Sequence, residues 1–432
     1  MTLPHKRAAS GPLFILILSG LMAFTSLSTD IYLPAMPVMA AELHGDAELT
    51  ITGFLIGFAV AQLVWGPVSD RLGRRTPLLI GMVLFIIGSV GCALSTSIEQ
   101  IIFWRVFQAL GACTGPMLAR AMVRDLFART RAAQMLSTLT IVMAIAPIVG
   151  PLMGGQMIKI TSWHAIFWLL VAIGLLMLVA LRWLPETLPP EQRQKGSPLK
   201  AFHHYGQLLR NHIFMRYTLS LTSYYIAAYA FITGSPDVYI RYFGVEPQHY
   251  GWLFAVNILG VMAMSVVNRR LVQRHALGDL LKAALVVATL AMVTLALTTR
   301  LHYGGIVGIV ICVFLFFSMN GVIAATSTAA ALDEAGEFAG SASALIGSLQ
   351  YGSGIVSSLL LAGLHDGTPW TMAWIMAVFT LLSLLLAWTP SAPLMMNTPH
   401  RLKPVQVPSG NITPCLRLVK TFVADYGYTG LN

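Results

Sequence analysis

The chain has 432 residues, of which 56% are hydrophobic and only 10% are charged. A soluble domain carries about 25% charged residues, so this composition excludes a surface that faces water on all sides, and the apolar content excludes intrinsic disorder. The net charge is +10, which in a soluble protein would suggest binding to nucleic acid. In a membrane protein, positive charge is explained by attraction to the anionic cytoplasmic leaflet, so no nucleic-acid partner is expected. Four scattered cysteines predict neither a disulfide framework nor a metal site, and we expect no cofactor.

The apolar segments are long and continuous, which predicts membrane-spanning helices rather than the alternating strands of a β-barrel. About 20 residues are needed to cross the hydrocarbon layer. This length gives twelve predicted helices, in chain order 12–39, 48–68, 76–97, 99–123, 134–158, 163–184, 213–236, 248–268, 279–299, 304–330, 340–363 and 370–389. The first is longer than the roughly 7–15 apolar residues of a signal peptide, so we interpret it as an uncleaved helix.

The orientation of these helices follows from the distribution of lysine and arginine. If the N-terminus lies in the cytoplasm, 23 of the 27 basic residues fall on the cytoplasmic side. Three of the others fall outside, and Arg105 lies within the fourth helix. The positive-inside rule therefore predicts that both termini are cytoplasmic.

The longest break between predicted helices divides the chain into two parts. The predicted domains are a cytoplasmic N-terminus (1–11), a six-helix half (12–184), a proline-rich and charged linker (185–212), a second six-helix half (213–389) and a largely disordered cytoplasmic tail (390–432). Equal halves are typical of transporters that carry an internal repeat, with a substrate site near the midplane between the halves. The fold class predicted is therefore an all-α membrane protein of twelve helices.

A segment rich in glycine and arginine lies in the predicted loop between the second and third helices. Its candidate residues are Gly66, Asp70, Arg71, Gly73, Arg74 and Arg75. We expect the glycines to allow a tight turn and the aspartate to lie near the positive end of another helix, such as the one opening at Gly340. The arginines can bond helix C-terminal carbonyls or a second carboxylate. The segment therefore predicts a latch on the cytoplasmic side, since an ordinary basic loop explains its arginines but not its aspartate and glycines.

Two charged residues, Asp30 and Arg105, lie well inside predicted helices. Inserting a charge at such a depth costs about 2.5–3.5 kcal/mol, so a functional role is the first hypothesis for each. Asp30 lies nine residues before Met39, about 13 Å below the outer end of its helix, and Arg105 lies six residues after Glu99, about 9 Å below. At similar depth, they either pair directly or interact through shared waters. The pair either fixes the packing, or Asp30 binds and releases a proton as its distance from the cation changes.

The fifth predicted helix combines prolines with closely spaced glycines. The residues are Pro147, Gly150, Pro151, Gly154 and Gly155. Proline removes a backbone donor and bends a helix, whereas small residues let a neighbouring helix approach closely. Two interpretations are equally open on chemistry alone: a hinge with a tight seam that limits proton leak, or ordinary glycine-mediated packing.

These motifs resemble those of the major facilitator superfamily. The segment 66–75 resembles its signature between helices two and three, 105–112 its fourth-helix motif, 146–155 its fifth-helix antiporter motif, and 28–37 the end of the first helix in drug exporters. Together with 186–191 and 332–334, they resemble the Bcr/CflA drug-resistance subfamily, which includes bicyclomycin resistance proteins. The resemblance covers residues 10–390 approximately.

The resemblance implies a monomer in the bacterial inner membrane, with a substrate cavity lined by the first, fourth, seventh and tenth helices. The matching cavity candidates in this sequence are Tyr32, Gln108, Tyr224, Tyr225, Tyr229 and Asn320, with Phe24 and Phe231 as apolar walls. It also favours the functional interpretation of the fifth helix. Asp237, at the outer end of the seventh helix, is either a second protonatable group or a solvated helix end.

The function implied is a proton-coupled antiporter that exports small amphipathic drugs or metabolites. Its partners are a small-molecule substrate, protons and the lipid bilayer. The alternative is a proton-coupled symporter that imports a small metabolite. The motifs HExxH, GxSxG and GxxxxGK[ST] are absent from the sequence, which argues against an enzyme and against an ATP-driven pump.

Overall fold

A computed structural model describes residues 12–127, 129–193, 199–335 and 339–389, and the structural statements below concern these residues. The two predicted cytoplasmic ends, 1–11 and 390–432, lie outside this range. The described chain is helical throughout and contains no strand. The all-α prediction is therefore confirmed for the part of the chain that the structure describes.

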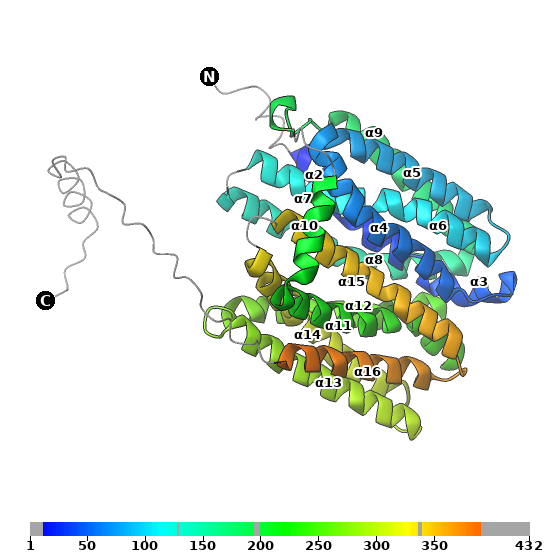
Figure 1. Cartoon of the computed structure of the whole chain (residues 1–432). Helices are drawn as coiled ribbons and strands as arrows, with labels where there is room; N and C mark the ends of the chain where they lie inside the picture. Colours follow the sequence, from blue (N-terminus) through cyan, green and yellow to red (C-terminus); the bar gives the residue numbers. More distant parts are fainter. Residues whose placement is uncertain (1–11, 128, 194–198, 336–338, 390–432) are drawn as a thin grey trace, which may run out of the picture. The chain divides into compact units, whose positions relative to one another are not determined.

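The long helices follow the predicted order, except that the predicted linker contains a further helix and the fourth predicted helix is divided at Cys113 (Figure 1). They are α2 (Pro12–Asp30), α3 (Met36–Leu43), α4 (Glu48–Leu72), α5 (Arg75–Leu94), α6 (Ile98–Ala112), α7 (Thr114–Leu126), α8 (Arg129–Ile160), α9 (Trp163–Ala180), α10 (Leu199–Arg210), α11 (His212–Pro236), α12 (Pro247–Leu271), α13 (Leu277–Arg300), α14 (Gly305–Ala335), α15 (Ala339–Leu364) and α16 (Pro369–Trp388). Short helical turns join some of them: η1 (Leu33–Ala35), η2 (Leu181–Trp183), η3 (Pro190–Gln192) and η4 (Asp237–Tyr242).

Eleven helical segments in the described residues are long and apolar enough to span a membrane. Helix α11, the seventh predicted span, is present where the sequence predicts it but is not among the eleven. Its serine, threonine and tyrosine side chains lower its hydropathy, and they are sheltered from lipid because α11 packs against α14, α15 and α16. Of its 25 residues, 16 are buried. This helix therefore spans the membrane as an internal element of the bundle.

The first predicted helix is not continuous. Helix α2 ends at Asp30, the turn η1 follows, and α3 continues to Leu43. Pro34 and Pro37 explain the break, because neither can donate a backbone hydrogen bond to the preceding turn. The break leaves Asp30 at a helix end, next to irregular backbone rather than within a regular helix.

Two further prolines free carbonyl groups that side chains from other elements then bond. Pro116 cannot donate to Ala112 O, at the junction of α6 and α7, and the Thr25 hydroxyl donates to that oxygen at 3.3 Å. Pro67, inside α4, cannot donate to Leu63 O. Tyr205 of α10 donates its hydroxyl to Leu63 O at 3.2 Å. These bonds tie α2 to the fourth span and the linker helix α10 to the second.

The helices before and after the linker meet along two seams, one between α4 and α15 and the other between α8 and α12. Helix α15 runs beside α4 in Figure 1. In the first seam Ser348 Oγ donates to Ala59 O at 2.8 Å. Nearer the outer end, the Thr52 and Ser358 hydroxyls are 2.5 Å apart.

The second seam depends on glycine. A Cβ at Gly155 would overlap the backbone carbonyl of Pro247, and a Cβ at Gly251 would lie 2.7 Å from the backbone nitrogen of Leu152. Turn η1 and helix α3 add contacts to α12 and η4 at the same end of the bundle. The two parts of the chain are therefore closely packed at the end that the charge distribution assigns to the outside.

Candidate functional site

Arg105 lies on α6 and is fully buried. Its Nη1 donates to the Ser28 carbonyl at 3.0 Å and to Gln108 Oε1 at 2.6 Å. The guanidinium carbon lies 4.3 Å from the ring centre of Tyr32 and 4.4 Å from that of Phe54. Two aromatic faces thus supply cation–π contacts in a place that water does not reach. The cation is held between α2 and α4.

Two nitrogens of this guanidinium, Nε and Nη2, are buried and have no partner among the described residues. An unsatisfied buried donor costs about 1–3 kcal/mol, so a purely structural arginine would be expected to use them. Gln108 is in turn fixed, because its Nε2 donates to Ser89 Oγ of α5 at 2.8 Å. The arrangement holds Arg105 firmly on one side and leaves two buried donors without a partner in this structure.

Asp30 does not form an ion pair with Arg105 within 4 Å in the described chain. The carbonyl of Ser28, freed at the end of α2, takes the guanidinium donor instead. Of the two arrangements left open by the sequence, the direct pair is therefore not the one formed in this structure. Asp30 is only 6% exposed and has no hydrogen bond to another described residue within the usual limits.

Elements from both parts of the chain surround Asp30. Gly150 of α8 packs against it, since a Cβ there would lie 3.4 Å from the Asp30 Cβ. The carboxyl is close enough to Tyr229, Tyr250 and Tyr351 to interact with their hydroxyls electrostatically. These tyrosines belong to α11, α12 and α15. A change in the spacing of the two parts of the chain therefore changes the surroundings of Asp30.

The glycines of the fifth span face two ways. A Cβ at Gly154 would overlap the carbonyl oxygen of Ile31, and a Cβ at Gly150 would lie 3.3 Å from the Ile31 nitrogen. Gly155 faces Pro247 of α12 instead. Helix α8 runs through both Pro147 and Pro151 without ending. Helix α8 thus packs closely between the break in the first span and the start of the eighth span, α12. A role of this helix in limiting proton leak stays a prediction.

The segment 66–75 is mostly helical, so the prediction of a loop is wrong for most of it. Helix α4 continues to Leu72, and a Cβ at Gly66 would meet nothing within 4 Å, so this glycine makes no turn. Pro67 does not end the helix because Tyr205 bonds the carbonyl that it frees. Only Gly73 turns the chain, with a φ of +92° that favours glycine.

Arg74 is the centre of a charged cluster on the predicted cytoplasmic side. It bonds Asp70 at 2.6 Å, Asp125 of α7 at 2.9 Å and Ser69 Oγ at 2.8 Å. Burial lowers the pKa of this guanidinium, but the hydrogen bonds and charges of the two carboxylates outweigh burial, so the pKa lies above its usual value. Asp70 thus pairs with the arginine four residues later; no described contact joins it to Gly340.

Arg71 is exposed and Arg75 reaches the carbonyl of Arg182, at the end of the sixth span, at 3.4 Å. The expected partners of the arginines, a helix-end carbonyl and a second carboxylate, are thus both present. In the described chain, however, these partners belong to the first six spans and the start of the linker. The cluster fastens the predicted cytoplasmic ends of that part of the chain to one another.

Glu186 is a member of this cluster that sequence reasoning did not single out. Its carboxylate accepts the backbone N–H groups of Arg74 and Arg75, at 2.8 and 3.1 Å, and so caps the N-terminus of α5. Its neighbour Thr187 donates to Asp125 Oδ2 at 3.0 Å. A carboxylate directly after the sixth span, opposite a helix start rich in arginine, was the signal that could have indicated this contact.

Glu186→Gln is expected to destabilise the protein by about 1.5–3 kcal/mol, the usual contribution of hydrogen bonds to a charged group. The variant keeps the size of the side chain but loses its charge. Thermal unfolding of the purified protein in detergent measures the effect. Glu191→Gln, at an exposed carboxylate of η3, is the matched control and should leave the midpoint unchanged. Equal midpoints for the two variants would show that the cap contributes nothing.

Three of the predicted cavity residues fill the interior instead. Tyr224 is fully buried and donates its hydroxyl to Phe316 O at 2.9 Å. Phe231 packs on Phe254 and Phe317, and Phe24 packs on Phe85 with ring centres 4.3 Å apart. In this structure these three side chains stabilise their own part of the bundle and present no surface to a substrate. Periodicity along a helix cannot distinguish such positions from a cavity wall.

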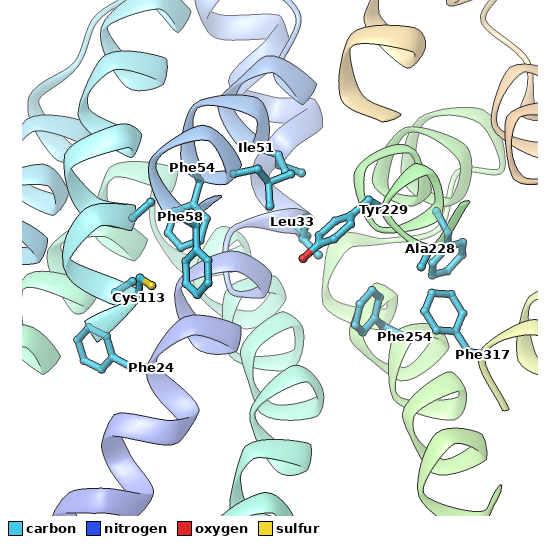
Figure 2. Packing of buried hydrophobic residues seen from close by; sticks show 14 of the residues in the cluster. Phe24, Leu33, Ile51, Phe54, Phe58, Cys113, Ala228, Tyr229, Phe254 and Phe317 are labelled. Atoms are coloured by element: carbon cyan, nitrogen blue, oxygen red, sulfur yellow. The ribbon is translucent and has the colours of Figure 1, made fainter. Parts of the chain in front are cut away.

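A group of aromatic residues does face across the bundle. Tyr229 extends from α11 toward the side on which Phe54 and Phe58 lie (Figure 2). Its ring centre is 6.3 Å from those of Tyr225 and Tyr351. The ring centre of Tyr351, on α15, is 4.0 Å from that of Phe58, on α4. Phe58 and Tyr351 were missed because the resemblance directed attention to four other helices. They place apolar ring faces where the two parts of the chain meet.

The remaining cavity candidates differ in role. The Tyr32 ring packs against the Arg105 guanidinium, and the Tyr32 hydroxyl lies 3.1 Å from the Thr50 hydroxyl. Gln108 Oε1 accepts a hydrogen bond from the same guanidinium and so orients it. Asn320 of α14 and Tyr225 of α11 keep partly exposed surface. The Oδ1 atom of Asn320 has no partner in the described chain. Tyr225, Tyr229 and Asn320 thus remain the better-placed substrate contacts among the residues predicted.

Asp237 is not a simply solvated helix end. Its side chain is 18% exposed, pairs with Arg241 at 3.1 Å and lies 3.9 Å from His365 Nε2. Together with Glu48 these residues line a small outer cavity of about 60 Å³. The cavity is formed by elements from both parts of the chain. The alternative, a second protonatable group, stays a prediction.

Long apolar helices around buried charged and aromatic groups define the class of a multi-pass membrane protein. A family model described as the Major Facilitator Superfamily matches residues 18–358. The chain belongs to this superfamily, so it is a transporter rather than an enzyme. Its curated relatives agree with the Bcr/CflA-like resemblance found in the motifs.

Three relatives show the extent of the similarity. The uncharacterized MFS-type transporter YdgK of Bacillus subtilis is 35% identical, over 87% of this chain and 94% of that protein. The bicyclomycin resistance protein homolog of Haemophilus influenzae is 30% identical, over 86% and 94%. Multidrug resistance protein D of Escherichia coli is 28% identical, over 90% and 98%. The similarity therefore extends over nearly the whole length of each relative.

Solved structures share the fold at low sequence identity. The nucleoside transporter NupG superposes with a TM-score of 0.71 at 14% identity, covering 86% of this chain and 98% of that one. The inward-open xylose transporter XylE of Escherichia coli gives 0.65 at 16% identity, covering 87% and 96%. At these identities the comparison shows the fold alone. The predicted major facilitator fold is confirmed.

Proposed function

We propose that the protein exports small amphipathic drugs or metabolites across the bacterial inner membrane in exchange for protons. The observation that carries the proposal is the separation of Asp30 from Arg105: a carboxyl and a guanidinium share the interior without an ion pair, and two guanidinium donors are free. If Asp30 and Arg105 served only to fix the packing of the helices, their side chains would be expected to form an ion pair. Both termini are placed in the cytoplasm on the distribution of basic residues.

The proposed mechanism is alternating access between two six-helix halves. Burial favours the neutral form of a carboxyl, and a nearby cation favours the ionised form. Asp30 lies at the break in the first span, against α8 and near tyrosines of the other half, so rocking of the halves changes both influences. The carboxyl binds a proton when open to the outside and releases it when open to the cytoplasm. Substrate moves in the opposite direction, held against the aromatic group around Tyr229.

Export is favoured over import by the relatives. The names of the relatives refer to bicyclomycin resistance, chloramphenicol resistance and multidrug resistance. The similarity of the fold to a xylose transporter does not weigh against this, because the same fold serves many functions. The alternative, a proton symporter that imports a metabolite, predicts accumulation of substrate in cells rather than its loss.

The test is drug susceptibility in a bacterial host whose own efflux systems are deleted. Empty vector and wild type are compared on bicyclomycin, a sulfonamide, a phenicol and a lipophilic cation. We expect resistance to at least one compound, and uptake of that compound by everted vesicles only while a proton gradient is maintained. The proposal is contradicted if the protein reaches the membrane without giving resistance, or if vesicle uptake survives an uncoupler.

A further inference from the structure

Arg120 lies near the predicted cytoplasmic end of the fourth span, and the proposed mechanism does not use it. It lies on α7, and within the described chain only its Nε donates a hydrogen bond, to the Pro116 carbonyl oxygen of its own helix at 3.0 Å. No carboxylate of the described chain lies within 4 Å of it. The Nη atoms of its guanidinium are thus not engaged by another described side chain.

The exposure pattern along α7 shows where Arg120 points. Arg120 is exposed and Met117 and Ala121 keep partial exposure, whereas Ala119, Met122 and Val123 are buried. A face with a charge at its centre is unsuited to lipid, since an unpaired charge in hydrocarbon is costly. This face of the helix therefore borders space that solvent enters.

That space lies between the two halves. The Arg120 guanidinium is close enough to Tyr351 of α15 and to Cys113 of its own span to interact with both electrostatically. Cys113 lies two turns earlier along the fourth span and is buried. Because the outer end of the bundle is closely packed, solvent reaches Arg120 from the predicted cytoplasmic side.

The cation and the aromatic rings together form a site of mixed character. Tyr351 lies within electrostatic range of Arg120 and keeps partly exposed surface, whereas Phe58, with its ring centre 4.0 Å from that of Tyr351, is buried behind it, so one end of the site carries positive charge and the other presents the Tyr351 ring. Asp30 is also within electrostatic range of Tyr351. The guanidinium lacks a carboxylate of its own, and this leaves the counter-charge to a ligand. Guanidinium groups bind carboxylates and similar planar anions especially well.

We propose that Arg120 binds the anionic group of the transported compound, and that the substrates include organic anions with an aromatic or other apolar body seated on Tyr351. This inference rests on the proposed export function and specifies its substrate class. A substrate entering from the cytoplasm meets Arg120 before it reaches Asp30. The positive charge attracts organic anions to the site and disfavours lipophilic cations.

The test compares three probes in energised everted vesicles: the anion carboxyfluorescein, neutral chloramphenicol and the cation tetraphenylphosphonium. Arg120→Gln is expected to lower transport of the anion about tenfold, the loss of a charge-assisted contact, while chloramphenicol transport changes less than about twofold. Arg120→Lys should retain most anion transport. Arg270→Gln, which removes an exposed charge at the end of α12, is the control.

Other outcomes separate the two proposals. Transport of chloramphenicol or the cation by the wild type, without the anion, overturns the substrate class and leaves export intact. An equal loss of all probes in Arg120→Gln, at normal membrane levels, also overturns it, since the residue then serves folding or coupling. Transport of no probe contradicts export itself. Binding of carboxyfluorescein to the purified wild type should weaken as salt rises, and absence of such binding contradicts the assignment whether or not the variant folds.

Discussion

Asp30→Asn is expected to abolish uphill export while leaving downhill exchange of substrate in place. Asparagine has nearly the shape of aspartate but binds no proton, so the halves can still rock while the proton gradient no longer drives them. Asp30 makes no described hydrogen bond or ion pair that the substitution would break, and a folding defect is therefore not expected. We expect drug resistance to fall to the level of the empty vector.

The measurement is made in everted vesicles with and without a proton gradient, at matched amounts of protein in the membrane. The wild type should concentrate substrate only with the gradient. The variant should give the same slow equilibration in both conditions. Asp279→Asn, at an exposed carboxylate in the first turn of α13, is the control and should behave as the wild type. Uphill export by Asp30→Asn would rule out Asp30 as the coupling group.

Gly154→Ala is expected to cause the largest structural effect of any single methyl group considered. Its Cβ would overlap the carbonyl oxygen of Ile31, which is backbone and cannot rotate away. Helix α8 must move outward or the broken segment after Asp30 must shift. Overpacking of this kind costs about 1–3 kcal/mol, and here it also displaces the residue next to the proposed proton site. We expect a lower unfolding midpoint and loss of export.

Gly308→Ala is the matched control for this substitution. Gly308 also lies within a helix, α14, but a Cβ there meets nothing within 4 Å. Alanine at such a position is expected to stabilise a helix by roughly 0.5–1 kcal/mol. The two glycine substitutions should therefore move the unfolding midpoint in opposite directions. If Gly154→Ala unfolds at the wild-type temperature and exports normally, the close contact with Ile31 is not required.

The helix order could be predicted from the sequence because hydrophobic length decides it. Helix ends and breaks depended on partners that are distant in sequence. Pro67 is a normal signal for the end of a helix, yet α4 continues because Tyr205, 142 positions from Leu63, supplies a replacement donor. No local pattern reveals such a donor. The same is true of Glu186, whose value as a cap depends on where α5 begins.

The sequence could predict how deep the two charged residues of the candidate site lie, but not which groups they contact. Counting residues along two helices placed Asp30 and Arg105 in the same layer, and both are buried in the structure. It could not show that the break after Asp30 frees the Ser28 carbonyl, which competes with the carboxylate for the guanidinium. Aromatic residues were harder, because Tyr224 and Tyr225 are adjacent in sequence and only the second keeps exposed surface.

The hydrogen bond between Tyr205 and Leu63 fixes the linker helix α10 to α4, so that the linker does more than connect the two halves covalently. Helix α10 is joined to α11 through the single residue Asn211, whose side chain caps α11 by accepting two of its N–H groups. Any tilt of α11 therefore pulls directly on the hydroxyl that bonds α4. A rocking motion that separates the two must forgo this bond, at about 1 kcal/mol. The covalent connection between the halves thus biases the conformational equilibrium toward the state described here.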